Sequence, residues 1–574
     1  MAGIYGLYSS SDLEKKSYSE YFFSNNMDHI INQDMQYRSF LYGRSVLNKF
    51  NNDRFIIEND HNIICIEGIN YENKNWKDNV ELEYTTKGID FVKKDNALFA
   101  GFIFDKRLEK LFLFTDHLGT KALYFYHDKL THSFLFASEL KVLTKACSDN
   151  DISLNPSIDG FNCLLSFGYM LDDLTPVESI KKIKPGTILC FDIKTGTLSE
   201  NRYFRLKKEK ISPSKEESIE NIDRLVLSSI ENEWRKDLEY EIPSFAFLSG
   251  GLDSRVNVLL ADKMGFHPSV CLNFSQTGAP DHTIAKRIAD QEGFNYTFYK
   301  LDKGHYFINQ LERLVEANSG MTTLNRAAHM FRAIENFSYS DKGLAHSGQI
   351  GDVLFGSFIK PGFDLESDVG KLGSINDPKI LNQISILSEL TKSYDNDVEL
   401  FSYEQRQING TMDGDKTIAH FTDVSSPFYN KALLKYCYNL PDKYKQKKLI
   451  YLEWMLQKHP ELLDYPLDMT GTKYSNPISF NIFRFYKKGR RFIQKKFGYG
   501  NELMNPYDLW FKQNDQLQSE IDQSFTSHIN MIRNKQLRHN IKHVFNYNVQ
   551  GKFNAVTALL TFKLHFSNDR TSLQ

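Results

Sequence analysis

Residues 244–254, SFAFLSGGLDS, determine how the larger part of this chain is expected to fold. The first five read as a buried strand, a loop with two glycines follows, and a helix is expected from about Asp253. Glycines let a backbone approach a ligand closely, and the N–H groups at a helix N-terminus attract anions. The stretch therefore predicts a phosphate or pyrophosphate site. It lacks the GK[ST] lysine of a Walker loop, and an ordinary Gly-rich turn with a Ser or Asp cap is the alternative interpretation.

Strands and helices alternate on the C-terminal side of this loop. Residues 270–274 read as the next strand, a helix is expected from about Asp281, and residues 296–301 read as a further strand. Strands separated by helices indicate a parallel α/β sheet. From about residue 306 onward the periodicity is mainly helical.

The first 200 residues have a different organisation. Short segments rich in aromatic and branched residues are separated by charged or Gly-containing turns, at residues 62–68, 97–104, 110–115 and 122–126, and a hairpin is expected at 185–198. This pattern is typical of a sheet sandwich. A charged stretch at 205–217 contains a proline and marks a boundary. We therefore predict two domains, residues 1–205 and 210–574.

Composition excludes several classes of protein. The 574 residues carry 70 Lys+Arg against 72 Asp+Glu, which gives no electrostatic argument for nucleic-acid binding. No run approaches the roughly 18–20 apolar residues of a membrane span. The six cysteines are scattered, and none forms a CxxC or Cys/His cluster, so neither a disulfide framework nor a zinc site is expected. The N-terminus does not read as a signal peptide, and we expect a cytoplasmic protein.

Four motifs together resemble one known family. Residues 249–254 resemble the pyrophosphatase loop of ligases that release pyrophosphate from ATP, in particular the asparagine synthetase family. Residues 347–356, SGQIGDVLFG, resemble the second synthetase motif of that family. Residues 115–124, TDHLGTKALY, and 134–139, FLFASE, resemble stretches of its N-terminal glutaminase domain. The resemblance extends from residue 1 to about residue 475.

This resemblance implies both a fold and a reaction. The fold would be α/β plus α+β, with an α-β-β-α glutamine amidotransferase-like sandwich over residues 1–205. Residues 210–574 would form a parallel-sheet α/β synthetase domain with a helical C-terminal part. The implied enzyme is a carbon–nitrogen ligase with ATP and Mg²⁺ as cofactors. A substrate carboxylate is adenylated, pyrophosphate leaves, and an amine then attacks to give an amide and AMP.

Matching positions supply the candidate site residues. By similarity, ATP would be bound by Ser249, Gly250, Gly251, Asp253, Ser254, Leu272, Phe274, Ser347 and Gly348. Asp253 and Asp352 would bind Mg²⁺, because carboxylate oxygens suit a metal that bridges to phosphates. Lys473 would neutralise charge on the α-phosphate and the leaving pyrophosphate. An ordinary surface lysine is the alternative interpretation of Lys473.

The glutaminase motifs depart from the family pattern. The family nucleophile is a cysteine exposed when the initiating methionine is removed, and Ala2 stands at that position here. The family Asn-Gly-Glu motif that holds glutamine is replaced by Glu67-Gly68-Ile69. Asp116 persists, although its role there is equally well structural. We therefore predict that glutamine hydrolysis has been lost.

The second synthetase motif also departs from the pattern. Amide-forming asparagine synthetases usually have a glutamate at the position of Gln349, where it is thought to act as general base toward ammonia. Glutamine orients a substrate but takes up no proton, so another acceptor amine or another base is expected. The β-lactam synthetases and lasso-peptide cyclases resemble this chain in keeping the scaffold and losing the glutaminase.

Two alternatives remain beside an amide ligase that acts on an unknown carboxylate. One is an asparagine synthetase that uses free ammonia, and the other is a nucleotide-binding pseudoenzyme or scaffold subunit. The expected partners are a small-molecule or peptide carboxylate and an amine, with neither nucleic acid nor a membrane span. The sequence leaves the oligomeric state open, a homodimer included.

Overall fold

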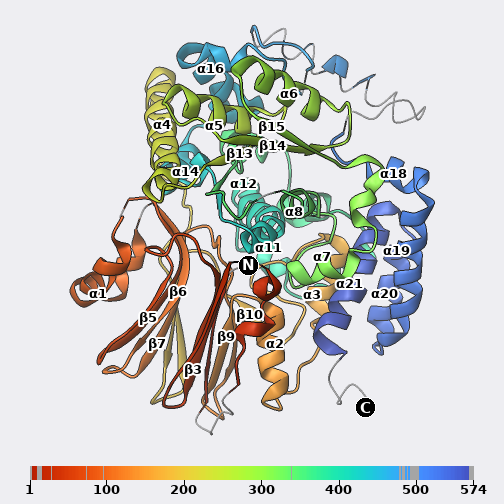
Figure 1. The fold of residues 1–574 in the computed structure, drawn as a ribbon. Coiled ribbons are helices and arrows are strands. Elements are labelled where there is room, and N and C mark those ends of the chain that lie inside the picture. Colours follow the sequence, from red (N-terminus) through yellow and green to blue (C-terminus); the bar gives the residue numbers. More distant parts are fainter. Residues whose placement is uncertain are drawn as a thin grey trace.

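The computed structural model describes residues 3–567 with short gaps. The residues it does not describe within that range are 10–15, 28, 73, 95, 327, 338, 469, 477–479, 481, 483–484, 488 and 491–502. Two antiparallel sheets form the N-terminal part, and a parallel sheet surrounded by helices lies beside them (Figure 1). The layout is the predicted combination of a sandwich and an α/β region.

Two six-stranded sheets make up the N-terminal sandwich. The first has the order β10-β8-β9-β1-β3-β2, built from Ile180–Lys182, Tyr124–Asp128, Ser133–Ala137, Gly3–Tyr8, Phe40–Leu47 and Ile30–Tyr37. The second has the order β12-β11-β7-β6-β5-β4, built from Thr197–Arg202, Thr187–Asp192, Lys110–Thr115, Ala97–Asp105, Asn62–Asn70 and Phe55–Glu58. These strands confirm the predicted sandwich and the hairpin.

Aromatic side chains hold the sandwich together. Rings from both sheets, including Phe40, Phe102 and Phe134, form one buried cluster between them. Helix α1 (Trp76–Lys87) covers the outer face of the second sheet through Trp76. Helices α2 (Leu140–Asp149) and α3 (Ile158–Ser166) lie on the side of the first sheet (Figure 1). The layers are therefore α-β-β-α, as predicted.

The third sheet is parallel and five-stranded. Its order is β15-β14-β13-β16-β17, built from Tyr296–Lys300, Val270–Ser275, Phe245–Phe247, Ala345–His346 and Val424–Ser425. Helices α4 (Lys215–Glu239), α5 (Leu252–Lys263), α6 (Pro280–Glu292) and α8 (Ala328–Glu335) connect or cover its strands. The predicted parallel α/β sheet is confirmed, and the strand before the glycine loop lies at its centre.

The C-terminal helices return to the N-terminal part. They are α18 (Tyr507–Gln513), α19 (Asp515–His528), α20 (Lys535–Phe545) and α21 (Val549–Phe566). Helices α20 and α21 lie beside α3, α21 also contacts α2, and α18 and α19 pack on α21 (Figure 1). The Asn554 amide on α21 donates a 2.9 Å hydrogen bond to the Leu165 carbonyl on α3. The division at residues 205–210 therefore stays a prediction, because the end of the chain packs on both parts.

Two expectations drawn from the composition concern the cysteines and membrane-spanning helices, and the structure bears on both. All six cysteines are free thiols, so there is no disulfide framework. Within the described ranges, no helix has both the length and the apolar character needed to cross a membrane.

Candidate functional site

The two synthetase motifs meet at one edge of the parallel sheet. Strand β13 leads into the glycine loop and α5, while β16 leads into residues 347–352. The chain runs from β13 outward to β14 and β15, then returns to β16 on the other side of β13. The direction of strand order therefore reverses between β13 and β16. In open parallel sheets this reversal forms a crevice at the carboxyl ends of the strands, where ligands bind.

Hydroxyl groups and one carboxylate fix the shape of the glycine loop. The Ser249 and Ser254 hydroxyl oxygens are 2.9 Å apart, and the Gly251 N–H donates to the Ser249 hydroxyl at 3.1 Å. The Gly250 N–H donates to the Asp281 carboxylate at 3.3 Å. A Cβ on Gly250 would come within 2.8 Å of the Pro280 carbonyl oxygen, so α6 leaves room only for glycine. The loop is thus preformed at the N-terminus of α5.

The second motif lies directly against this loop. A Cβ on Gly348 would sit 2.3 Å from the Ser254 amide nitrogen, and one on Gly351 would sit 2.6 Å from the Asp253 carboxyl carbon. The Asp352 N–H donates to Asp253 Oδ2 at 3.0 Å. The two segments, about 100 residues apart in sequence, therefore form one surface, and both glycines are needed for that contact.

The carboxyl group of Asp253 is poorly solvated. Its Oδ1 atom is buried without a hydrogen-bond partner in the part of the chain that the structure describes. Burial and the charge of Asp352 raise the pKa of Asp253 to about 7, although Lys448 acts in the opposite direction. Two neighbouring carboxylates with an unsatisfied oxygen suit Mg²⁺, which binds one or two carboxylates together with substrate phosphates.

Phosphate oxygens would have to complete such a metal shell. Among the described residues, no group of three or more His, Cys, Asp or Glu side chains is arranged to hold a metal ion. The two carboxylates Asp253 and Asp352 would thus supply part of the shell of a Mg²⁺ ion that also binds phosphate oxygens.

The predicted adenine-side residues lie next to the loop. The Leu272 carbonyl accepts a hydrogen bond from the Leu248 N–H at 3.1 Å. The Phe274 ring, on the same strand, packs edge-on against Phe247 with 5.5 Å between the ring centroids. Ser347 is buried, and its hydroxyl accepts from the Gln349 N–H at 3.2 Å. Leu272 and Phe274 on β14 and Ser347 after β16 therefore lie on or directly after the strands on either side of β13, which leads into the glycine loop.

A different lysine from the predicted one lies beside the carboxylates. The Lys473 side chain is 55% exposed, and its ammonium group lies 3.6 Å from Asp464. By contrast, the Lys448 ammonium group lies 3.9 Å from Asp352, and the Lys448 side chain is only 19% exposed. Sequence reasoning missed Lys448 because it belongs to a run, Gln446–Lys448, that reads as ordinary surface. The predicted role of Lys473 stays a prediction.

Gln349 contacts a buried carboxyl group that the sequence did not single out. Its side-chain amide donates to Oδ2 of Asp415, and the Ser426 hydroxyl donates to its main-chain oxygen at 2.8 Å. Burial raises the pKa of Asp415 to about 8. Asp415 belongs to the short sequence Asp413-Gly414-Asp415 in a helical region, which matches no motif that the sequence analysis uses.

Two of the predicted glutaminase positions, Asp116 and Glu67, are engaged in structural contacts. Ala2 lies outside the described residues. The Asp116 carboxylate accepts from the Leu118 N–H at 2.7 Å and the Phe99 N–H at 3.0 Å, so it stabilises its own turn. Glu67 lies 3.4 Å from Arg54 and 3.8 Å from Lys121.

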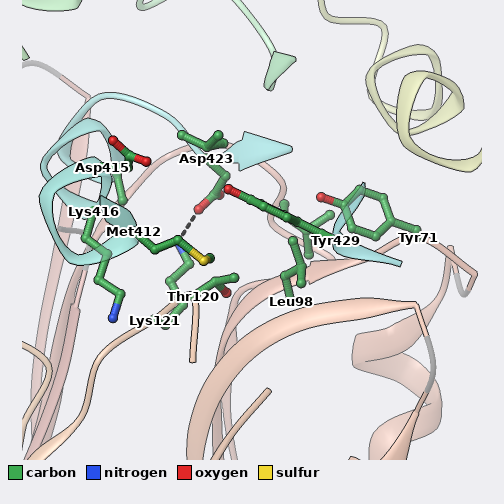
Figure 2. A pocket seen from close by; sticks show the side chains of 12 residues that line it. Tyr71, Leu98, Thr120, Lys121, Met412, Asp415, Lys416, Asp423 and Tyr429 are labelled. Atoms are coloured by element: carbon green, nitrogen blue, oxygen red, sulfur yellow. Dashed lines mark hydrogen bonds and ion pairs between the residues drawn. The ribbon is translucent and has the colours of Figure 1, made fainter. Parts of the chain in front are cut away.

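These two cations also reach across to the parallel sheet. Arg54 and Lys121 both pair with Asp423, which directly precedes β17. All four side chains are nearly inaccessible to solvent, and we call Arg54, Glu67, Lys121 and Asp423 the charge cluster. Next to it lies a narrow cavity, in which side chains of the sandwich face side chains of residues 412–429 (Figure 2).

Comparison with known proteins identifies both parts of the chain. A family model for a glutamine amidotransferase domain matches residues 78–204, and a model for asparagine synthase matches residues 226–408. Together the two models cover more than half of the chain.

Several proteins of known sequence are similar to this chain. A putative glutamine-hydrolyzing asparagine synthetase 2 of Methanocaldococcus jannaschii is 30% identical over 171 residues, covering 30% of this chain and 32% of that protein. Asparagine synthetase 3 of Bacillus subtilis is 31% identical over 173 residues, covering 30% of this chain and 26% of that protein. A probable asparagine synthetase of Acanthamoeba polyphaga mimivirus is 24% identical, covering 50% and 52% respectively. The chain thus matches about a third or less of the first two relatives.

Solved structures give a weaker likeness. The allosteric regulatory enzyme of purine biosynthesis superposes with a TM-score of 0.21 at 10% identity, over 52% of this chain and 80% of that one. The B. subtilis glutamine phosphoribosylpyrophosphate amidotransferase, complexed with ADP and GMP, gives 0.22 at 11%, over 70% and 96%. At these scores the superpositions carry no weight for function.

Proposed function

The chain belongs to the asparagine synthetase family, and from that premise we propose that it is an ATP-dependent carbon–nitrogen ligase that does not hydrolyse glutamine. In this proposal it adenylates a substrate carboxylate, releases pyrophosphate and transfers the acyl group to an amine, with AMP as the second product. One observation carries the proposal: Gly351 of the second motif packs against the Asp253 carboxyl group of the glycine loop. This contact lies at the point where the strand order reverses between β13 and β16.

The residues of the crevice have separate tasks in this reaction. The hydroxyl groups of Ser249 and Ser254 and the N-terminus of α5 face the phosphates, where N–H groups favour negative charge. Asp253 and Asp352 would hold Mg²⁺, which when bound neutralises phosphate charge. Lys448 adds a positive charge on the same side. These groups are fixed before the reaction, so little reorganisation opposes the charge that develops on the departing pyrophosphate.

Loss of glutamine hydrolysis is supported by the composition of the sandwich. Ala2 supplies a methyl group where the family nucleophile is a thiol. Glu67, at the position of the family asparagine, is taken up in the charge cluster. A free amine, rather than glutamine, would then supply the nitrogen.

Asparagine synthesis is the second candidate function, because the similar relatives carry that name. In that case the carboxylate is aspartate and the amine is ammonia. Gln349, where these synthetases usually have glutamate, favours another substrate pair.

Exchange of radiolabelled pyrophosphate into ATP tests the proposal. The purified chain would be assayed with Mg²⁺ and a panel of acids containing aspartate, other amino acids, peptide acids and uronic acids. We expect exchange that depends on one class of acid and is lost in Asp253→Asn. The matched control is Asp290→Asn, an exposed residue of α6 that pairs with the exposed Lys286 of the same helix. Failure to bind Mg-ATP would overturn the proposal.

A further inference from the structure

The amide-forming step requires a proton acceptor that position 349 does not provide. When a neutral amine attacks an acyl-adenylate, the new amide must lose one proton from nitrogen. The Gln349 amide takes up no proton at physiological pH. The acceptor must therefore be another group close to Gln349.

The structure holds Gln349 with its side chain turned toward Asp415. Its N–H donates to the Ser347 hydroxyl at 3.2 Å, and its carbonyl accepts from the Ser426 hydroxyl at 2.8 Å. These bonds fix its main chain within the second motif. Its amide N–H₂ then donates to Asp415 Oδ2. One hydrogen bond therefore connects the nucleotide-binding loops to Asp415.

Asp415 lies at an irregular turn of helix and lines the cavity beside the charge cluster. It ends α13 (Asp413–Asp415), which directly follows the π-helix η7 (Ser402–Met412). π-Helical turns are rare and frequently occur at functional sites. The cavity has a volume of about 40 Å³, enough for one or two molecules the size of water or an amino group.

The other charged groups of the cavity already have partners. Lys121 pairs with Asp423, and Lys416 donates to Asp413. Tyr71 and Tyr429 contribute hydroxyl groups (Figure 2). Asp415 thus lines a small, mainly apolar cavity, and its carboxyl group accepts a hydrogen bond from an amide rather than from a cation.

We propose that Asp415 accepts the proton from the attacking amine and that Gln349 positions it; this assignment rests on the proposed function. The amine lone pair forms the C–N bond to the acyl carbon. The bond from that carbon to the AMP oxygen breaks, and AMP leaves with the electron pair. The surplus proton on nitrogen passes to the Asp415 carboxylate.

The electrostatic surroundings of Asp415 suit this task. Burial raises its pKa to about 8, while the hydrogen bond from Gln349 acts to lower it. A general base is most effective when its pKa is close to the working pH. An aspartate with an ordinary pKa would be a much weaker base toward an amine.

Separate assays of the two half-reactions test Asp415. Asp415→Asn and the control Asp290→Asn would be compared with wild type, using the acid that gives most exchange, with aspartate tried first. Pyrophosphate exchange reports adenylation, and AMP release with ammonium chloride reports amide formation. Hydroxylamine is the second amine, because it is largely unprotonated at neutral pH and needs little help from a base.

We expect Asp415→Asn to keep exchange within about twofold and to lose about 100-fold or more in AMP release with ammonia. With hydroxylamine as the amine, Asp415→Asn should regain most of the lost rate of AMP release. Asp415→Glu should retain part of the rate with ammonia. Wild-type amide formation in Asp415→Asn would overturn the assignment, and so would an equal loss with both amines or a parallel loss of exchange. Absence of exchange in wild type with every acid would overturn the proposed function and the assignment together.

Discussion

Replacing Asp423 with asparagine tests whether the charge cluster joins the sandwich to the parallel sheet. The cluster holds two cations and two carboxylates, with side-chain exposures of 1% for Arg54, 2% for Glu67, 5% for Lys121 and 8% for Asp423. The substitution leaves one buried positive charge uncompensated. Removing one partner of a buried ion pair costs about 3–5 kcal/mol, and we expect that loss in the free energy of unfolding.

Urea unfolding followed by tryptophan fluorescence would measure the loss. Asp290→Asn is the control, because its partner Lys286 is 53% exposed and such exposed helix pairs contribute only about 0.3–0.5 kcal/mol. The double variant Asp423→Asn with Lys121→Gln returns the cluster to one cation and one carboxylate. We expect it to be more stable than the sum of the single losses predicts, by about 1 kcal/mol or more.

Two results would refute this reasoning. One is a loss in Asp423→Asn no larger than in the Asp290 control. The other is strict additivity in the double variant, since independent charges would show no coupling.

Three further predictions concern the nucleotide site and the nitrogen source. Gly348→Ala should weaken Mg-ATP binding by about tenfold or more in calorimetric titration, because its Cβ would meet the Ser254 amide. Gly489→Ala, whose Cβ would meet nothing within 4 Å, should leave binding unchanged, and equal effects would contradict the contact. Lys448→Met should reduce pyrophosphate exchange by about tenfold and by more than Lys473→Met, and the reverse order would assign the charge-neutralising role to Lys473. With glutamine as nitrogen source we expect no glutamate release, whereas ammonium chloride or another free amine should support AMP formation. Sustained glutamate release would disprove the loss of hydrolysis.

Local sequence patterns were sufficient to predict the layers of the fold. Aromatic and branched segments separated by turns indicated the sandwich, and the alternation around the glycine loop indicated the parallel sheet. Both outcomes follow from periodicity and turn chemistry, which act within about 10–20 residues. The return of α20 and α21 to the sandwich depends on contacts between residues almost 400 positions apart, such as Asn554 with Leu165, and no local pattern contains it.

The site was predictable only where motifs mark it. Residues of the two loops were identified because their glycines and hydroxyl groups occur in a recognisable order. Lys448, Asp415 and Asp423 were missed for the opposite reason. Each is a single charged residue in a helical or charged stretch, and only tertiary packing makes it a neighbour of Asp352, Gln349 or Lys121.

The charge cluster gives the sandwich a role that needs no nucleophile. Asp423, held by Arg54 and Lys121, directly precedes β17, and the Ser347 N–H donates to the Ser425 carbonyl of that strand at 2.8 Å. The next residue, Ser426, donates to the Gln349 carbonyl. A change in the cluster would therefore reach the second synthetase motif along residues 423–426, which include the two residues of β17. If this path supports the site, Asp423→Asn should reduce the rate of amide formation as well as the free energy of unfolding. The rate should already be lower at urea concentrations far below those that unfold the chain.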